Sequence, residues 1–179
     1  MVRASLSPEH QRLWAGAAVR LVSAAFPREG SDVATWPAGA RLLPHALAVL
    51  DYTKPFGVEP EATASLLIDT AFYPWSRGQY RQALTLEEQA LATYRRVLGE
   101  DHPDTLSSMN NLAETRRDLG DLNGARELHE HALATRRRLL GDDHPDTQRM
   151  LAGLIRFGEV AGLLAFGAGH RFLPGHRPW

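Results

Sequence analysis

Apolar residues recur three or four positions apart in separate stretches of this chain. Between residues 122 and 140, for example, they fall at Leu122, Ala125, Leu128 and Ala132, which is the spacing of one face of an α-helix. Glycine or proline stands at most of the boundaries between the stretches. The pattern predicts an all-α chain, without strands in 60–160, whose helices occupy 9–26, 36–51, 60–77, 80–98, 103–119, 122–140 and 145–160.

Residues at the expected helix ends support these boundaries. Pro103 suits a first helical turn, where its missing N–H costs nothing, and either Asp101 or His102 can act as the N-cap before it. Gly120 suits the end of the same helix. Pro74 lies inside an expected helix, so it is predicted to kink or shorten that helix.

Two parts of the chain are near-copies of each other. GEDHPDT begins at Gly99 and GDDHPDT at Gly141, an offset of 42 residues. At the same offset, residues 78–105 and 120–147 are identical at 17 of 28 positions, far more than chance produces. The similarity indicates a tandem duplication of a two-helix unit.

The duplicated unit resembles the tetratricopeptide repeat. That family has a small residue within its first helix, a glycine between the helices and two alanines seven positions apart in the second helix. The matching residues here are Ala113, Gly120, Ala125 and Ala132. The 42-residue length, the HPDT sequence and NNLA at 110–113 are similar to the kinesin-light-chain subtype. The resemblance implies a right-handed α-solenoid of helix pairs with an N-terminal helical cap.

The repeats divide the chain into three expected parts. These are an N-terminal helical region (1–58), two full repeats and one partial repeat (59–161), and an irregular or disordered tail rich in glycine and proline (162–179). Residues 20–58 are similar to the helical segment that precedes the repeats in bacterial NB-ARC (STAND) ATPases. The nucleotide-binding motif G-x-x-x-x-G-K-[ST] does not occur in the chain. A stand-alone relative, a remnant of a split gene and a portion of a longer protein all stay open.

Composition excludes several kinds of chemistry. The 179 residues include 20 Lys and Arg against 21 Asp and Glu, and this net charge of −1 disfavours a nucleic-acid binder. The absence of cysteine removes disulfides, thiolate nucleophiles and cysteine-ligated metals. Neither a signal peptide nor an apolar run long enough to cross a bilayer is present, so we expect a cytoplasmic protein without a membrane span.

The titratable residues form no recognisable catalytic or metal-binding pattern. His102 and His144 recur in the two HPDT sequences, where helix capping is the expected role. Glu87 and Glu88 are expected to be solvated rather than to form a catalytic pair. The protein is therefore expected to be no enzyme and to bind no cofactor or metal.

Arginines recur near the ends of the second helices with the 42-residue period, at Arg95, Arg96 and 136–138. We expect them to complement the helix dipoles, since positive charge is favoured at helix C-termini. Binding of an acidic partner or of nucleic acid is the alternative.

The resemblance also implies a binding groove formed by the first helix of each repeat. In the family, groove asparagines hold the backbone of an extended peptide, and the arginines here could pair with acidic groups of that peptide. The aromatic residues are open to two interpretations, an apolar pocket of the groove or packing against the N-terminal helices. The residues expected to bind a partner are Ser107, Asn110, Glu114, Arg117, Asp118, Arg149, Arg156, Phe72 and Trp75.

The expected function is protein–protein interaction by an adaptor or scaffold that binds a peptide or a protein surface. The alternatives are the regulatory or sensor portion of an NB-ARC signalling system, and an accessory protein or enzyme of a biosynthetic cluster. Self-association is a further expectation, because the partial third repeat lacks a second helix to cover Met150, Leu151 and Leu154. A homodimer or a partner domain could cover this face, and so could the tail.

Overall fold

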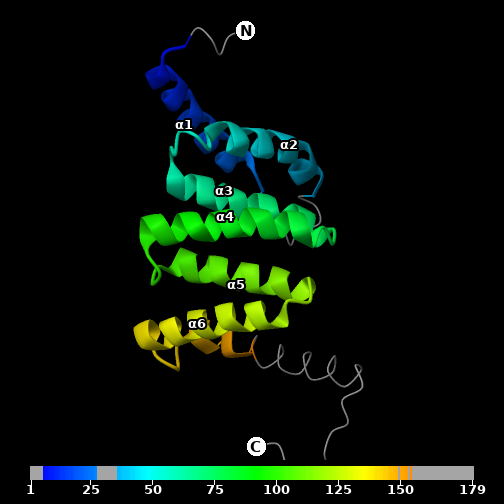
Figure 1. The fold of residues 1–179 in the computed structure, drawn as a ribbon, viewed down its shortest axis with the longest axis vertical. Helices are drawn as coiled ribbons and strands as arrows, with labels where there is room; N and C mark the ends of the chain where they lie inside the picture. The colour runs from blue at the N-terminus through cyan, green and yellow to red at the C-terminus, as the bar shows by residue number, and fades with distance from the viewer. Residues whose placement is uncertain (1–5, 28–35, 149, 153, 155–179) are drawn as a thin grey trace, which may run out of the picture.

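The computed structural model describes residues 6–27, 36–148, 150–152 and 154. Within these residues all regular secondary structure is helical, and the helices succeed one another along the long axis of the molecule (Figure 1). Residues 145–148, 150–152 and 154 are also helical. The bounds are α1 (Pro8–Ala25), α2 (Trp36–Thr53), α3 (Pro60–Ser76), α4 (Tyr80–Leu98), α5 (Pro103–Asp118) and α6 (Leu122–Leu140).

Helices that are neighbours in the sequence are also neighbours in space. α3 packs against α4, α5 packs against α6, and the contact between α4 and α5 joins the two pairs. α1 and α2 contact each other, and both contact α3. Figure 1 shows α3 to α6 lying side by side across the long axis, with α1 and α2 at the opposite end from α6. The predicted all-α stack of helix pairs is confirmed, and each end of α1 to α6 lies within two residues of its predicted position.

Alanine is frequent among the fully buried residues of the helix pairs. Seven alanines in α3 to α6 have no exposed surface, and six of them form three pairs separated by the 42-residue period. A side chain this small allows two helix backbones to approach closely. Both helix pairs therefore have the same small buried residues at equivalent positions; they are Ala71 and Ala113, Ala83 and Ala125, and Ala90 and Ala132.

The repeated HPDT sequences cap helices, as predicted. His102 precedes α5, and its ring Nδ1 accepts a hydrogen bond of 3.2 Å from the backbone N–H of Asp104. His144 accepts the equivalent bond, also 3.2 Å, from the N–H of Asp146. Each histidine thus satisfies a donor that has no partner inside its helix. Of the two predicted cap residues before α5, it is His102 that acts as the N-cap.

Pro74 has only a slight effect on the length of α3. The helix continues to Ser76, one residue before the predicted end. Beyond it, the Pro74 carbonyl accepts hydrogen bonds from the N–H groups of Arg77 (3.2 Å) and Gln79 (2.8 Å). A proline this close to the end of a helix removes little from the hydrogen-bond ladder.

Arginines near the ends of α4 and α6 are paired with acidic residues of the following loops. Arg95 Nε lies 2.9 Å from Glu100 Oε1, and the equivalent Arg137 Nε lies 2.7 Å from Asp142 Oδ1. These exposed pairs contribute little to stability, about 0–1 kcal/mol each. The pairs do neutralise part of the positive charge of the arginines at these helix ends, so these arginines would attract an acidic partner less strongly.

Several predicted features lie outside the described residues. They include the tail at 162–179, so the predicted domain boundaries stay predictions. In the partial third repeat, Met150 is only 4% exposed, and Arg136 Nη1 lies 3.8 Å from its sulfur. Leu151 and Leu154 are half-buried. Self-association through this repeat also stays a prediction.

Substitution of Gly120 tests whether the turn between α5 and α6 requires the backbone conformation of this glycine. Its φ is +85°, and a Cβ placed there would meet no atom within 4 Å, so strain would come from the backbone alone. We expect Gly120→Ala to lower the free energy of unfolding by about 1 kcal/mol, measured by urea denaturation.

Gly39→Ala is the matched control. Gly39 lies inside α2, and an added Cβ would make only an ordinary contact of 3.6 Å with Tyr73. Because alanine favours helices, this variant should be at least as stable as the wild type, by up to about 1 kcal/mol. Equal losses in both variants would contradict the explanation from backbone conformation.

Candidate functional site

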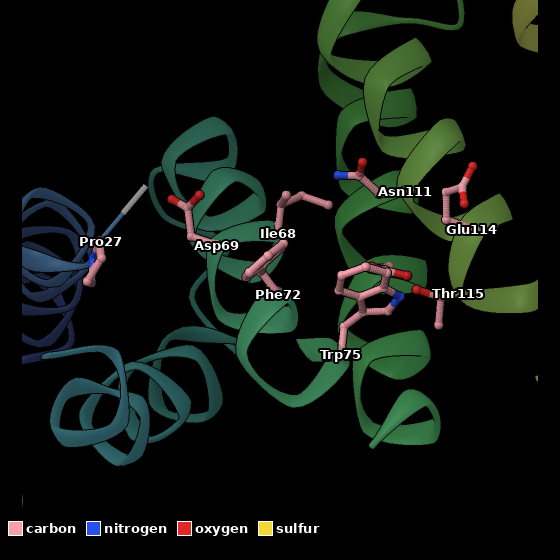
Figure 2. Close-up of a pocket in the computed structure, with 9 residues that line it drawn as sticks. Pro27, Ile68, Asp69, Phe72, Trp75, Asn111, Glu114 and Thr115 are labelled. Carbon is pink, nitrogen blue, oxygen red and sulfur yellow. The ribbon is translucent and has the colours of Figure 1, made fainter. Parts of the chain in front are cut away.

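A cavity of about 300 Å³ lies between the first helices of the two repeats, α3 and α5. Figure 2 shows Ile68, Phe72 and Trp75 of α3 and Asn111 of α5 in the space between the two helices. One wall is apolar and aromatic, whereas the other carries amide, hydroxyl and carboxyl groups. The residues that line it are Pro27, Ile68, Asp69, Phe72, Trp75, Glu87, Asn111, Glu114 and Thr115.

The aromatic wall comes from one turn of α3. The ring centroids of Phe72 and Trp75 are 5.5 Å apart, with the ring planes tilted by 42°. The indole Nε1 of Trp75 donates a hydrogen bond of 3.0 Å to Asp118 Oδ2 on α5. Trp75 also packs, together with Ile68, against the core formed by α1 to α4. Trp75 therefore lines the cavity and also packs against this core, and its role in binding stays a prediction.

The only arginine among the predicted groove residues of α5 is paired within its own helix. Arg117 Nη1 lies 2.5 Å from Glu114 Oε2, and Arg117 Nη2 lies 3.1 Å from Asp118 Oδ1. Glu114 Oε1 is also 3.5 Å from the ring Nε2 of His129 on α6. Two carboxylates share the guanidinium of Arg117, so this arginine brings no excess positive charge to the site.

Glu87 of α4 is the residue that the sequence analysis misjudged. It was expected to be solvated, but it is 5% exposed, whereas its neighbour Glu88 is exposed. Burial, with a smaller contribution from the negative charge of Asp118, raises the pKa of the Glu87 carboxyl from 4.5 to about 7. The nearby Thr115 hydroxyl lowers this pKa in part. Glu87 Oε2 and Thr115 Oγ1 are both buried, and neither atom has a partner that meets the geometric limits of a hydrogen bond.

The helix periodicity contained a signal for this burial. Ala83, Leu86, Ala90 and Leu91 are all buried on α4, and residue 87 lies within the same inward face. The equivalent position of the second repeat, 42 residues later, is His129, which is 2% exposed. A polar residue is therefore directed inwards at this position in both repeats.

The predicted site residues divide into three groups. Phe72, Trp75 and Glu114 line the cavity, and Asp118 and Arg117 lie at its edge through the contacts above. Ser107 is exposed, and its hydroxyl accepts a bond of 3.4 Å from Arg136, while Asn110 is half-buried and does not line the cavity. The remaining two, Arg149 and Arg156, lie outside the described residues. The binding roles of all nine stay predictions.

Several residues that line the cavity are absent from the predicted partner-binding residues. Asn111 lines the cavity in place of its neighbour Asn110, and its amide points towards α3 in Figure 2. Asp69 and Glu87 also contribute to the lining. Assigning groove positions one residue away on a helix changes the direction of a side chain by about 100°.

Two negative findings apply to the described residues. No group of three or more His, Asp or Glu side chains is arranged to hold a metal ion. None of the described helices combines the length and the apolar character that a membrane crossing requires.

Antiparallel helix pairs of one repeated length, stacked in chain order, define an α-solenoid repeat protein. The family model for the tetratricopeptide repeat matches residues 63–104 and 105–146. These two segments are tetratricopeptide repeats, as their motifs predicted.

Solved structures with the same fold include kinesin-light-chain-like proteins. One is a kinesin-light-chain-type protein of Podosopora anserina with nearly identical TPR-like repeats, at 19% identity and a TM-score of 0.61 over 86% of this chain and 66% of that chain. Another is BtubC (BKLC) of P. vanneervenii, at 16% identity and a TM-score of 0.61 over 88% of this chain and 68% of that one. At these identities the likeness concerns the fold.

Two curated relatives are similar to part of the chain. A nucleotide-binding leucine-rich repeat (NLR)-like protein of Hyaloscypha variabilis is 41% identical over 68 residues. A clustered mitochondria protein homolog of Candida albicans is 31% identical over 68 residues. Each match covers 38% of this chain but only 7% and 5% of the respective relative.

Glu87→Gln tests the buried carboxyl through the pH dependence of stability. The folded protein binds more protons than the unfolded chain between pH 4.5 and about 7, so Glu87 lowers stability as the pH rises through this window. Glutamine carries no ionisable group, so the Glu87→Gln variant does not lose this stability as the pH rises. We expect Glu87→Gln to be more stable than the wild type at pH 8, by as much as about 3 kcal/mol, and nearly equal to it at pH 4.

The matched control is Glu88→Gln, which removes the same charge one position along α4. Glu88 is exposed and pairs with Arg116 at 3.3 Å, so its loss should change stability by less than about 1 kcal/mol at either pH. Denaturation curves at both pH values provide the comparison. A Glu87→Gln variant that is less stable than the wild type at pH 8 would contradict the pKa assignment.

Proposed function

We propose that this protein is a non-enzymatic interaction module that binds an extended segment of a partner protein across α3 and α5. The observation that carries the proposal is the cavity of about 300 Å³ between these two helices. It lies at the junction of the two repeats, where a partner would contact both of them. Solenoid repeats use such extended surfaces for binding, because neighbouring repeats present equivalent side chains in a row.

The lining of the cavity supports a peptide as the ligand. Asn111 offers both a donor and an acceptor, which suits the backbone of an extended chain. Phe72, Trp75 and Ile68 offer an apolar surface for one side chain of that segment. An apolar pocket with a few polar groups is the usual form of a binding site.

The second candidate function is a regulatory portion of a nucleotide-binding signalling system. One observation favours it, the 41% identity with an NLR-like protein over 68 residues. A second feature is compatible with it: Leu13, Trp14 and Leu21 on α1 are exposed by 63%, 63% and 72%. An exposed apolar face of this kind is typical of a surface that docks against another domain.

The test of the interaction role is quantitative affinity capture with the full chain as bait, in lysate of the cells that encode it. Phe72→Ala and Asn111→Ala alter the cavity without touching the alanine contacts of the stack. We expect both variants to lose the same partner proteins by about tenfold or more, because truncating a central anchor residue typically costs 1–2 kcal/mol or more.

Glu130→Ala, on the exposed surface of α6, is the control bait. It should retain the same partners as the wild type. If the two cavity variants and the control capture identical sets of proteins, binding through the α3–α5 cavity is wrong. Circular dichroism of each bait separates loss of binding from loss of folding.

A further inference from the structure

The carboxyl of Glu87 is a buried polar group that forms no ion pair within the described residues. The residue is 5% exposed and lines the cavity between α3 and α5. Its Oε2 atom is buried and has no hydrogen-bond partner. A buried carboxylate without a partner is costly, since it has lost its hydration and gained nothing in exchange. The cavity therefore contains an acceptor that a suitable ligand group would satisfy.

The walls next to this carboxyl suit the stem of a long basic side chain. Ile68, Phe72 and Trp75 form the apolar and aromatic side of the cavity, as Figure 2 shows. Lysine and arginine lay their methylene groups along apolar surfaces while their charged ends reach a polar group. Aromatic rings add attraction for a cation that lies over them.

The charges around the cavity favour a cation over an anion. Asp69 on α3 and Glu114 on α5 line it together with Glu87 of α4, and Asp118 lies beside it on α5. Arg117 is bonded to both Glu114 and Asp118, and the ring Nε2 of His129 lies 3.5 Å from Glu114. An acidic ligand would meet buried negative charge, whereas a basic ligand would be attracted by it.

We infer that the cavity binds a lysine or arginine side chain of the partner, with the cationic end paired to Glu87 and the stem against Phe72 and Trp75. This inference rests on the proposed interaction function and specifies the chemistry of its ligand. It differs from the expectation at the sequence level that groove arginines pair with acidic groups of a peptide.

The pairing makes binding dependent on pH. Glu87 attracts a cation only when ionised, and its pKa of about 7 means that the ionised fraction rises about tenfold between pH 6 and pH 8. Affinity should rise by about the same factor. The other charged or titratable groups near it are Asp69, Glu114, Arg117, Asp118 and, beyond Glu114, His129. All of them are retained in Glu87→Gln, so the difference between the two pH profiles isolates Glu87.

The test is selection from a random decapeptide display library on the immobilised full chain at pH 8. Wild-type protein should enrich peptides that share one lysine or arginine next to an apolar residue. Synthetic copies of the enriched peptides should bind Glu87→Gln at least about tenfold more weakly, because a charge-assisted hydrogen bond is lost. Glu88→Gln, which removes an exposed charge on the same helix, should bind them like the wild type.

The outcomes separate this inference from the proposed function. Enrichment of acidic peptides, or basic peptides whose binding survives Glu87→Gln and is equal at pH 6 and pH 8, would overturn the inference and leave peptide binding intact. Enriched basic peptides that bind a Phe72→Ala variant like the wild type would also overturn it. Enrichment of no peptide at all would count against the proposed peptide-binding function, and the inference would fail with it.

Discussion

Close packing at alanine is the constraint on which the rest of this structure depends. Six of the fully buried alanines of α3 to α6 recur in pairs with the 42-residue period, so both helix pairs have the same small side chains at equivalent buried positions. Larger side chains at these positions would separate the backbones, since close-packed interiors do not absorb added volume without strain. The spacing of the two pairs in turn determines the width of the cavity between α3 and α5.

The same packing explains the burial of an acid. Glu87 shares the inward face of α4 with Ala83 and Ala90, so the helix cannot bury those alanines without also burying the glutamate. The folded protein accommodates the carboxyl by keeping it protonated up to about pH 7. In the second repeat, the equivalent His129 lies 3.5 Å from Glu114. The inward position is thus polar in both repeats, but only in the first does it line the cavity.

The local sequence was sufficient to predict the helices and their caps. Helical spacing of apolar residues, Pro103 in a first turn and Gly120 after a last turn are all signals that act within one or two turns. The duplication identified the repeat family, because two copies of HPDT and of the alanine pattern are unlikely to arise separately. The order of the packed helices followed from the family.

The site was predicted less well because its geometry depends on contacts between helices. The bond from Trp75 to Asp118 joins residues 43 positions apart, and no local pattern indicates it. Arg117 is paired with Glu114 and Asp118, so a partner would have to compete with these two carboxylates for its guanidinium. This pairing depends on how the side chains are placed on α5, which the sequence pattern does not show. The prediction that Glu87 is solvated was wrong because it relied on the charge of the side chain and not on its position on the inward face of α4.

The central claim is that the Glu87 carboxyl at the junction of the repeats is buried and lines the cavity, with no hydrogen-bond partner for its Oε2 atom. Measuring the ionisation of this carboxyl tests the claim directly. Carbon-13 NMR of the glutamate side-chain carboxyl groups, with the Glu87 signal assigned by its absence in Glu87→Gln, follows this titration in the full chain. The structure predicts a midpoint near pH 7 for this one carboxyl. A midpoint near 4.5, the ordinary value for glutamate, would mean that the carboxyl is solvated, and would contradict the account of the site.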